Sequence, residues 1–281
     1  MEKIDLHMHS TASDGSSTPR ELARECKAAG ITRAALTDHD TIDGVAEFLE
    51  EAGRIGLPAI SGLEYNVEYE GEMHILAYGM DIWNQELRDA LDVLANQRIT
   101  RASRMVKKLQ DQGYPITLER VEEIAGGGVL GRPHIARALL EKGFGENVED
   151  AFKRYLEPGK PGFLPRLKIK SSEAIRLARQ AGGHCVLAHP KLAYYPDYDE
   201  LLTRLKGEGL EGLEVYYPAH SDEEVEFFFG LAKKYDLFIT QGSDYHGKIR
   251  KSTQLFREQR GRAALEESVE RLFARVSSKK E

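Results

Sequence analysis

Histidines and carboxylates in this chain stand in short segments that are far apart in the sequence. The chain opens with DLHMHSTASDG, in which His7 and His9 are two residues apart and Asp14 follows five residues later. The same residue types return in TDHDT, GLE, MHILAYG, LAHP and GSDYH, at His39, Glu64, His74, His189, Asp244 and His246. Imidazole and carboxylate groups are natural ligands of divalent cations, so these segments could together bind metal.

The pair formed by His7 and His9 does not establish a site by itself. Side chains two residues apart on a strand point to the same side, so both histidines could simply end a strand, partly exposed. The elements that surround the other segments therefore decide between the two interpretations.

Short apolar runs precede most of these segments and predict strands. The runs are KIDL (3–6), AAL (34–36), PAIS (58–61), CVLA (185–188), LEVY (213–216) and FIT (238–240), and NVEYEGEMHILAY (66–78) predicts two strands that turn at Glu70 and Gly71. Helical patterns alternate with them over 19–29, where Thr18, Pro19 and Glu21 form a capping box with an entry proline, and over 44–55, 172–181, 198–207 and 221–235. This alternation indicates an α/β fold.

From about Trp83 to Leu167 the pattern is helical and contains no convincing strand. An apolar stripe is formed by Leu87, Leu91, Leu94, Met105, Val106 and Leu109, and the glycines at 126–128 and the pair Pro158-Gly159 interrupt the helical pattern. We therefore predict one barrel-like body formed by residues 1–82 and 168–281, which carries a helical insertion over 83–167.

The polar segments follow one strand after another, and this placement has a physical meaning. In a parallel barrel the loops at the carboxyl ends of the strands converge on one rim, where residues distant in sequence meet. Six histidines and three carboxylates would then share one cleft. Such a cluster is costly if its groups stay unpaired, and divalent cations relieve that cost. The arrangement therefore favours a metal-binding cluster over the interpretation that these residues simply end separate strands.

Composition and charge limit the other possibilities. The chain has 281 residues, 41% hydrophobic and 30% charged, as in an ordinary soluble globular protein. No segment approaches the ~18–20 consecutive apolar residues of a membrane span, and no signal peptide is evident, so we expect no membrane association. Two cysteines, Cys26 and Cys185, suit a reducing cytoplasm. The net charge of −7 argues against general nucleic-acid binding but allows a small phosphorylated substrate.

Taken in order, DLHMHSTASDG, TDHDT, GLE, MHILAYG, LAHP and GSDYH resemble the PHP (polymerase and histidinol phosphatase) family. The resemblance covers roughly 2–82 and 168–250. The segment GRPHIARAL (131–139) is similar to that of stand-alone PHP phosphoesterases that act on 3′,5′-nucleoside bisphosphates, some of which also trim RNA from its 5′ end. The resemblance implies a distorted (β/α)7 TIM-like barrel whose helical insertion forms part of the substrate pocket.

The resemblance also implies three metal positions. His7, His9, Glu64 and Asp244 would hold the first cation, and Glu64 would bridge it to a second, held also by His74 and His189. Asp14, His39 and His246 would hold a third. Imidazole and carboxylate ligands without thiolate suit Mn²⁺, Fe²⁺ or Zn²⁺. Cations that share a carboxylate tend to share a water, whose pKa falls toward neutrality, and the resulting hydroxide would attack phosphorus.

Holding the substrate requires cationic groups, and we expect Arg132 and His134 to serve both in binding and in catalysis. A guanidinium and an imidazole at a helix N-terminus can bind phosphate, although GRPHIARAL also suits a plain helix start. Arg98, Arg101 and Arg104 share a helical face that either is solvated or binds a second phosphate. His220 follows a predicted strand and is a further candidate for substrate binding.

We therefore predict a metal-dependent phosphoesterase acting on a small phosphorylated nucleotide, with short 5′-phosphorylated RNA as a further candidate substrate. One alternative is a histidinol-phosphate phosphatase, which the long insertion makes less favoured. The other is a non-catalytic PHP module that binds metal for stability, against which the complete ligand set argues. No obligate protein partner is evident in the sequence.

Overall fold

The protein is described here by a computed structural model that covers the chain except residues 1, 127–129, 166–167, 250–253, 256–261 and 279–281. Contacts along the chain divide it into two compact units. The first, Met1–Asp89 with Lys168–Glu281, is called the barrel unit below, and the second, Ala90–Leu167, the helical unit. The boundary falls within the long helix α3 (Gln85–Gln110), whose first turn is held to the barrel unit by an ion pair between Glu86 and Arg176.

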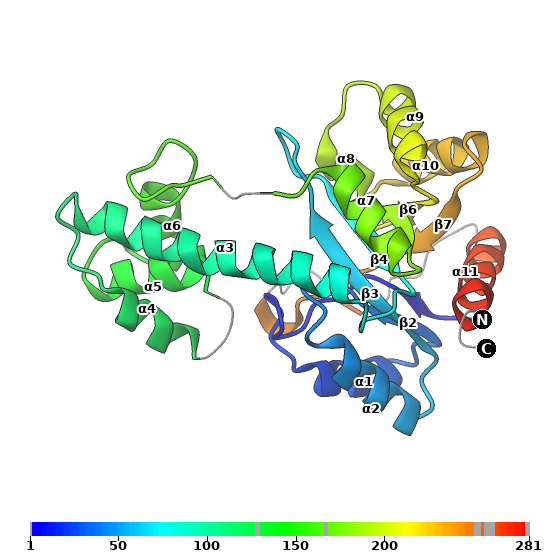
Figure 1. Ribbon diagram of the computed structural model, residues 1–281, viewed down its shortest axis with the longest axis horizontal. Helices are drawn as coiled ribbons and strands as arrows, with labels where there is room; N and C mark the ends of the chain where they lie inside the picture. The colour runs from blue at the N-terminus through cyan, green and yellow to red at the C-terminus, as the bar shows by residue number, and fades with distance from the viewer. Residues whose placement is uncertain (1, 127–129, 166–167, 250–253, 256–261, 279–281) are drawn as a thin grey trace. The chain divides into compact units, whose positions relative to one another are not determined.

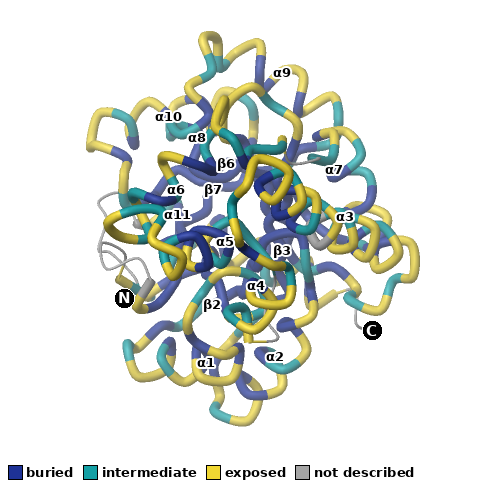
Figure 2. Tube along the Cα trace, turned by 90° about the vertical axis from the view of Figure 1, so that its left-hand side faces the viewer, coloured by how far each residue is buried: buried dark blue, intermediate teal, exposed yellow. Residues whose placement is uncertain are grey.

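Seven strands of the barrel unit form one sheet in the order in which they occur along the chain. They are β1 (Ile4–Asp5), β2 (Arg33–Leu36), β3 (Ala59–Asn66), β4 (His74–Tyr78), β5 (His184–Leu187), β6 (Gly212–Tyr216) and β7 (Phe238–Gln241). β1, β2 and β3 run parallel, as do β5, β6 and β7, whereas β4 is antiparallel to both of its neighbours. In Figure 2 the traces of β3, β6 and β7 are buried.

The first and last strands of this sheet meet, and the sheet thereby closes on itself almost completely. The backbone N–H of Leu6 donates a hydrogen bond of 3.0 Å to the carbonyl of Gln241. Farther along, Met8 and Tyr245 form a parallel bridge. Closure places the segments after β1 and after β7 side by side. The predicted α/β architecture, a distorted seven-stranded barrel, is confirmed.

The hairpin between β3 and β4 brings one more residue to the rim. β4 pairs with β3 from Asn66 opposite His74 to Gly62 opposite Tyr78. Because β4 runs antiparallel, its first residue lies where its parallel neighbours end. The sequence predicted the hairpin but divided β3 into two pieces, whereas Ala59–Asn66 is one continuous strand.

Helices cover the outside of the barrel (Figure 1). They are α1 (Pro19–Ala28), α2 (Val45–Arg54), α7 (Ser171–Gln180), α8 (Pro190–Ala193), α9 (Tyr198–Glu208), α10 (Asp222–Lys234), the 3-10 helix η1 (Gly247–Ile249) and α11 (Arg262–Ser277). The predicted capping box is present, since Thr18 Oγ1 accepts from the N–H of Glu21 and the Glu21 carboxylate accepts from the N–H of Thr18. The apolar face of α1, including Leu22 and Cys26, is buried.

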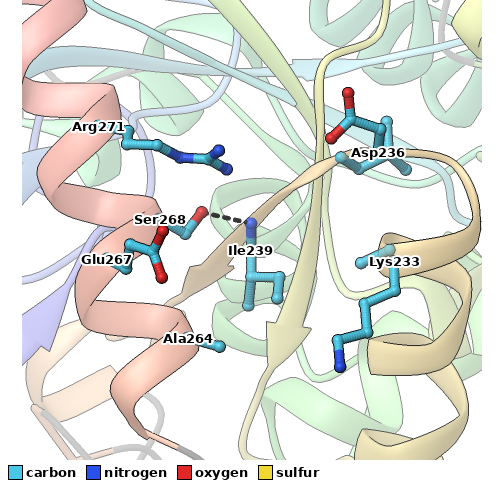
Figure 3. A pocket seen from close by; sticks show the side chains of 9 residues that line it. Lys233, Asp236, Ile239, Ala264, Glu267, Ser268 and Arg271 are labelled. Carbon is cyan, nitrogen blue, oxygen red and sulfur yellow. Dashed lines mark hydrogen bonds between the residues drawn. The ribbon is translucent and has the colours of Figure 1, made fainter.

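The sequence analysis missed the C-terminal helix α11. The helix packs on β7, where Ser268 Oγ accepts a 2.7 Å hydrogen bond from the N–H of Ile239 (Figure 3). The carboxylate of Glu266 also accepts from the N–H of Glu2, so α11 is bonded to the residue that precedes β1 by two positions. Among the helices of the described residues, none combines the length and apolar character needed to cross a membrane.

The helical unit has its own apolar core. It contains the rest of α3 together with α4 (Leu118–Ala125), α5 (Arg132–Glu141) and α6 (Val148–Tyr155). Met105, Val106 and Leu109 of the predicted stripe are buried here against residues of α5 such as Ile135 and Leu139. The predicted interruption at 126–128 lies mostly outside the described residues.

Candidate metal centre

The barrel brings the nine predicted ligands together at its carboxyl-terminal rim. His7 and His9 follow β1, His39 follows β2, His189 follows β5, and Asp244 and His246 follow β7. Glu64 lies in β3 and His74 begins β4. Apart from Asp14, whose side chain is 52% exposed, these residues are buried. The nine residues are called the ligand cluster below.

Glu64 lies at the centre of the ligand cluster. Its two carboxylate oxygens are within 3.3 Å of one nitrogen atom from each of five imidazoles. The distances are 3.2 Å to His7 Nε2, 3.3 Å to His9 Nε2, 2.9 Å to His39 Nδ1, 2.7 Å to His74 Nδ1 and 3.1 Å to His189 Nε2. A carboxylate with two oxygens in such surroundings is able to bridge two cations.

Asp244 and Asp14 extend the cluster on either side of His9 and His246. Asp244 Oδ1 lies 3.1 Å from His9 Nε2 and 3.5 Å from His246 Nδ1. Asp14 Oδ1 lies 3.2 Å from His246 Nε2 and 3.7 Å from His9 Nδ1. The rings of His9 and His246 stack with their centroids 4.1 Å apart. His9 is therefore positioned between two carboxylates that come from different loops.

Three sets of side chains have ligand atoms close enough to hold one cation each. They are His7, His9, Glu64 and Asp244; His39, Glu64 and His74; and His9, Asp14, His39 and His246. The first set has the composition that the resemblance implied, and the third adds His9. The second contains His39 in place of the implied His189, whose Nε2 lies 3.1 Å from Glu64 Oε1 and 3.2 Å from His74 Nδ1.

Burial and close opposite charges strongly change the pKa values in the cluster. Burial raises the pKa of Glu64, but His39, His7 and His74 overcome it and hold that pKa well below its usual range. Burial lowers the pKa of His9, but Asp244 and Glu64 overcome it and raise that pKa to about 10. The two carboxylates thus retain a proton on His9, and a cation that binds to this ring must displace it.

The ligand cluster contains buried polar atoms that lack hydrogen-bond partners. Among the residues that the structure describes, buried nitrogen atoms of four cluster histidines and one oxygen of Glu64 form no hydrogen bond; the atoms are His7 Nε2, His9 Nδ1, His9 Nε2, His189 Nδ1, His246 Nε2 and Glu64 Oε2. Buried polar groups left without partners are costly. Coordination of a divalent cation by imidazole nitrogens and carboxylate oxygens removes this cost. The residues of the ligand cluster therefore fit metal ions.

Two ligands have backbones in the left-handed region, which is unusual for residues other than glycine. The φ angles are 24° at His189 and 52° at Asp244. Each such conformation costs about 1–3 kcal/mol and persists where the surroundings hold it. The N–H of Asp244 donates to the carbonyl of His7 at 2.8 Å, which ties the loop after β7 to the segment after β1. Strain at both residues marks a functional region.

Sequence reasoning missed a fully buried carboxylate, Glu214, within β6. It accepts hydrogen bonds from His7 Nδ1 at 3.0 Å and from the backbone N–H of His189 at 2.7 Å. A charged residue inside the apolar run LEVY was the available signal. Asp38, the neighbour of His39 in the chain, accepts hydrogen bonds from the backbone N–H and hydroxyl of Ser10.

Arg132 and His134 lie in the helical unit at the start of α5. His134 Nδ1 accepts a 3.2 Å hydrogen bond from the N–H of Gly131, so the ring caps this helix. The Arg132 guanidinium lies 4.8 Å from the centre of the Phe152 ring. The plain helix start considered for this segment is therefore present. Since Nδ1 accepts, the proton of the neutral ring is on Nε2, where it can donate to an anion.

Arg104 lies on a groove within the helical unit. The groove has a volume of about 760 Å³ and is lined by Val93, Asn96, Gln97, Thr100, Arg101, Arg104, Leu164 and Pro165. Arg101 Nε donates to the carbonyl of Leu164 at 2.8 Å. The side chain of Arg98 lies outside the described residues. Arg101 thus takes part in the fold of this unit, and phosphate binding by the three arginines stays a prediction.

His220 lies in the barrel unit next to the ligand cluster. Its Nδ1 donates to the carbonyl of Val215 at 2.9 Å, and its ring lies 5.4 Å from that of Tyr217. The hydroxyl of Tyr217 donates to Asp244 at 3.0 Å. His220 is therefore connected to the cluster through the tyrosine.

A small cavity of about 210 Å³ lies between α10, the start of β7 and α11 (Figure 3). Its charged lining residues are Lys233, Asp236, Glu267 and Arg271. The ligand cluster follows the opposite end of β7. None of the predicted site residues lines this cavity.

Comparison with known proteins gives a consistent assignment. The PHP domain matches residues 5–207 of this chain. The chain is 34% identical over 249 residues to the 5′-3′ exoribonuclease Rnm of Escherichia coli. This match covers 86% of this chain and 84% of that protein. It is 32% identical over 252 residues to the 3′,5′-nucleoside bisphosphate phosphatase of Chromobacterium violaceum, with 88% of each chain covered.

A solved structure shows the same similarity in three dimensions. A candidate metal-dependent phosphoesterase from Bifidobacterium adolescentis superposes with a TM-score of 0.81 and 32% sequence identity. The match covers 96% of this chain and 95% of that one. The similarity therefore extends over both units of the chain.

Proposed function

Because this chain belongs to the PHP domain family, we propose that it is a metal-dependent phosphoesterase that hydrolyses phosphate monoesters of nucleotides. Its main substrates are 3′,5′-nucleoside bisphosphates. The observation that carries this proposal is Glu64 at the centre of five imidazoles, with two further carboxylates within reach of the same rings. Relatives that share a third of the sequence over most of its length act on nucleotides or RNA.

The nine residues of the ligand cluster would hold two to three divalent cations, in line with the three sets described above. Their nitrogen and oxygen donors suit Mn²⁺, Fe²⁺ or Zn²⁺. When bound, such cations polarise phosphoryl oxygens and make water a stronger nucleophile at neutral pH. Glu64 and Asp244 would contribute to catalysis by keeping the cations beside the phosphoryl group, whose negative charge increases during the reaction.

The substrate needs binding groups beyond the ligand cluster. We assign this role to the helical insertion over 83–167, which forms part of the substrate pocket in this proposal. His134 presents a donor at Nε2 because its Nδ1 accepts from Gly131, and Arg132 supplies a permanent positive charge beside it. Both stand at a helix N-terminus, where backbone N–H groups favour anions. Arg104 and His220 are further candidates for contacts to the nucleotide.

Short 5′-phosphorylated RNA is the second substrate class of this proposal. The support is the similarity to an exoribonuclease that acts from the 5′ end. A net charge of −7 does not favour long nucleic acids, so contacts near the scissile phosphate must supply the affinity. Two buried free thiols, Cys26 and Cys185, support a cytoplasmic location.

The test is phosphate release by the Mn²⁺-loaded protein from adenosine 3′,5′-bisphosphate, histidinol phosphate and a short 5′-phosphorylated RNA, each under the same conditions. We expect the highest kcat/KM with the bisphosphate. A higher value with histidinol phosphate would assign the protein to that alternative. No turnover of any phosphate ester by protein that retains its metal would support a non-catalytic module and contradict the proposal.

A further inference from the structure

The buried carboxylate of Glu214 touches two members of the ligand cluster without belonging to it. Its side chain has no exposed surface. Both of its oxygens face His7 Nδ1, at 3.0 and 3.3 Å, and Oε2 also accepts the backbone N–H of His189 at 2.7 Å. An ionised carboxylate is costly to bury unless it is well paired. These two partners come from the segments after β1 and after β5.

The contact with His7 determines which ring nitrogen can bind a cation. A carboxylate beside Nδ1 accepts the proton that this nitrogen carries, so the lone pair of the neutral ring is at Nε2. Nε2 lies 3.2 Å from Glu64 Oε1 and 3.6 Å from Asp244 Oδ1. The nitrogen that faces the cluster is therefore the one that Glu214 leaves available for coordination.

The contact with His189 acts on the backbone. His189 has φ 24° and ψ 62°, a conformation that is unfavourable for a side chain with a Cβ atom. The hydrogen bond from its N–H to Glu214 holds the peptide in this orientation. The following residues begin α8, so a change at this peptide would also displace the ring.

The neighbouring glycine shows how closely the chain approaches this carboxylate. A Cβ atom built on Gly242 would lie 2.0 Å from His7 Cβ and 2.6 Å from Glu214 Oε1. Real Cβ atoms essentially never come so close to such atoms. Residue 242 therefore has to be glycine for His7 and Glu214 to meet.

We propose that Glu214 is a positioning residue, which prepares the ligand cluster for divalent cations by selecting the Nε2 lone pair of His7 and by holding the backbone of His189. The inference rests on the proposed function in one respect, that the cluster binds metal. A carboxylate that orients a metal-binding imidazole in this way typically contributes about 10- to 100-fold to metal affinity.

The matched pair of variants is Glu214→Gln and Glu211→Gln. Glu211 also accepts a hydrogen bond from an imidazole, His184 Nδ1 at 2.8 Å, but this pair lies at the opposite end of β5 and β6. Zinc affinity is measured by competition with a chelating dye. We expect Glu214→Gln to weaken zinc binding about 10- to 100-fold, and Glu211→Gln to leave it within about twofold. Equal affinity of wild type and Glu214→Gln would overturn the inference.

A spectroscopic readout separates positioning from a general effect on folding. In zinc-loaded, ¹⁵N-labelled wild type, His7 should show a slowly exchanging Nδ1–H resonance, because this proton is buried and bonded to Glu214. Glu214→Leu, which removes both acceptor oxygens, should lose that resonance but keep the Nδ1–H signal of His220, which donates to Val215. A proton on His7 Nε2 in the zinc-loaded wild type would refute the assignment even if the variant does not fold. Neither measurement uses phosphate hydrolysis, so the proposed substrate can fail independently.

Discussion

Replacing Glu64 by Gln tests the centre of the cluster most severely. The substitution keeps the size of the side chain but removes the negative charge that lies within 3.3 Å of five imidazole nitrogens. It also turns one acceptor oxygen into an NH₂ group, which cannot coordinate a cation. Loss of one electrostatic catalytic group costs about 2.7–4 kcal/mol, equivalent to roughly 10²–10³-fold in kcat. We expect a loss of at least ~10²-fold in turnover.

The assay is phosphate release from adenosine 3′,5′-bisphosphate with Mn²⁺, together with the metal content of the same samples. Glu211→Gln is the control, because it also neutralises a partly buried carboxylate bonded to an imidazole, away from the ligand cluster. Near-normal turnover of a folded, metal-loaded Glu64→Gln protein would refute the reasoning. A parallel loss in the control would show that the effect is not specific to the site.

Three further substitutions test other parts of the account. Arg132→Ala should lower kcat/KM for the bisphosphate about 10- to 150-fold, because it removes one charge-assisted hydrogen bond that contributes roughly 1.5–3 kcal/mol. The kcat/KM for a small aryl phosphate should fall much less. Equal losses would assign Arg132 to the chemical centre or to the fold. Gly242→Ala should sharply weaken Mn²⁺ binding, measured by calorimetry, because its methyl group would overlap His7; unchanged affinity would contradict the packing described here. Hydrogen bonds from two arginines lower the pKa of Glu51 from 4.5 to about 2, so its stabilising effect is present above the unfolded pKa and is lost as the pH falls toward 2. Thermal unfolding of Glu51→Gln should therefore depend less on pH than that of wild type between about pH 5 and about pH 2.

The sequence was sufficient to predict the fold and the grouping of these nine side chains at one rim because both depend on local patterns. Strands such as AAL and FIT are short apolar runs, and most of the candidate ligands follow such a run within a few residues. The rim of a barrel then brings these positions together, independently of the length and conformation of the segments between them. His74 lies at this rim because its hairpin places the start of β4 there.

Other features depend on contacts between residues far apart in the sequence. Glu214 lies within a strand, and its role appears only when β6 places it beside His7 and the backbone of His189. The helix α11 follows a segment without clear periodicity, and its packing on β7 through Ser268 could not be read from the sequence. The role of Arg132 depends on how the helical unit meets the substrate, which no local pattern determines.

The most direct test of the central claim is a titration of metal-free protein with Mn²⁺, in which bound metal and turnover of adenosine 3′,5′-bisphosphate are measured on the same samples. The account predicts binding of about two to three equivalents per chain, in line with three sets of ligand atoms, with turnover that rises as these sites fill and disappears on chelation. Binding of less than about one equivalent, or turnover that persists after the metal is removed, would contradict it.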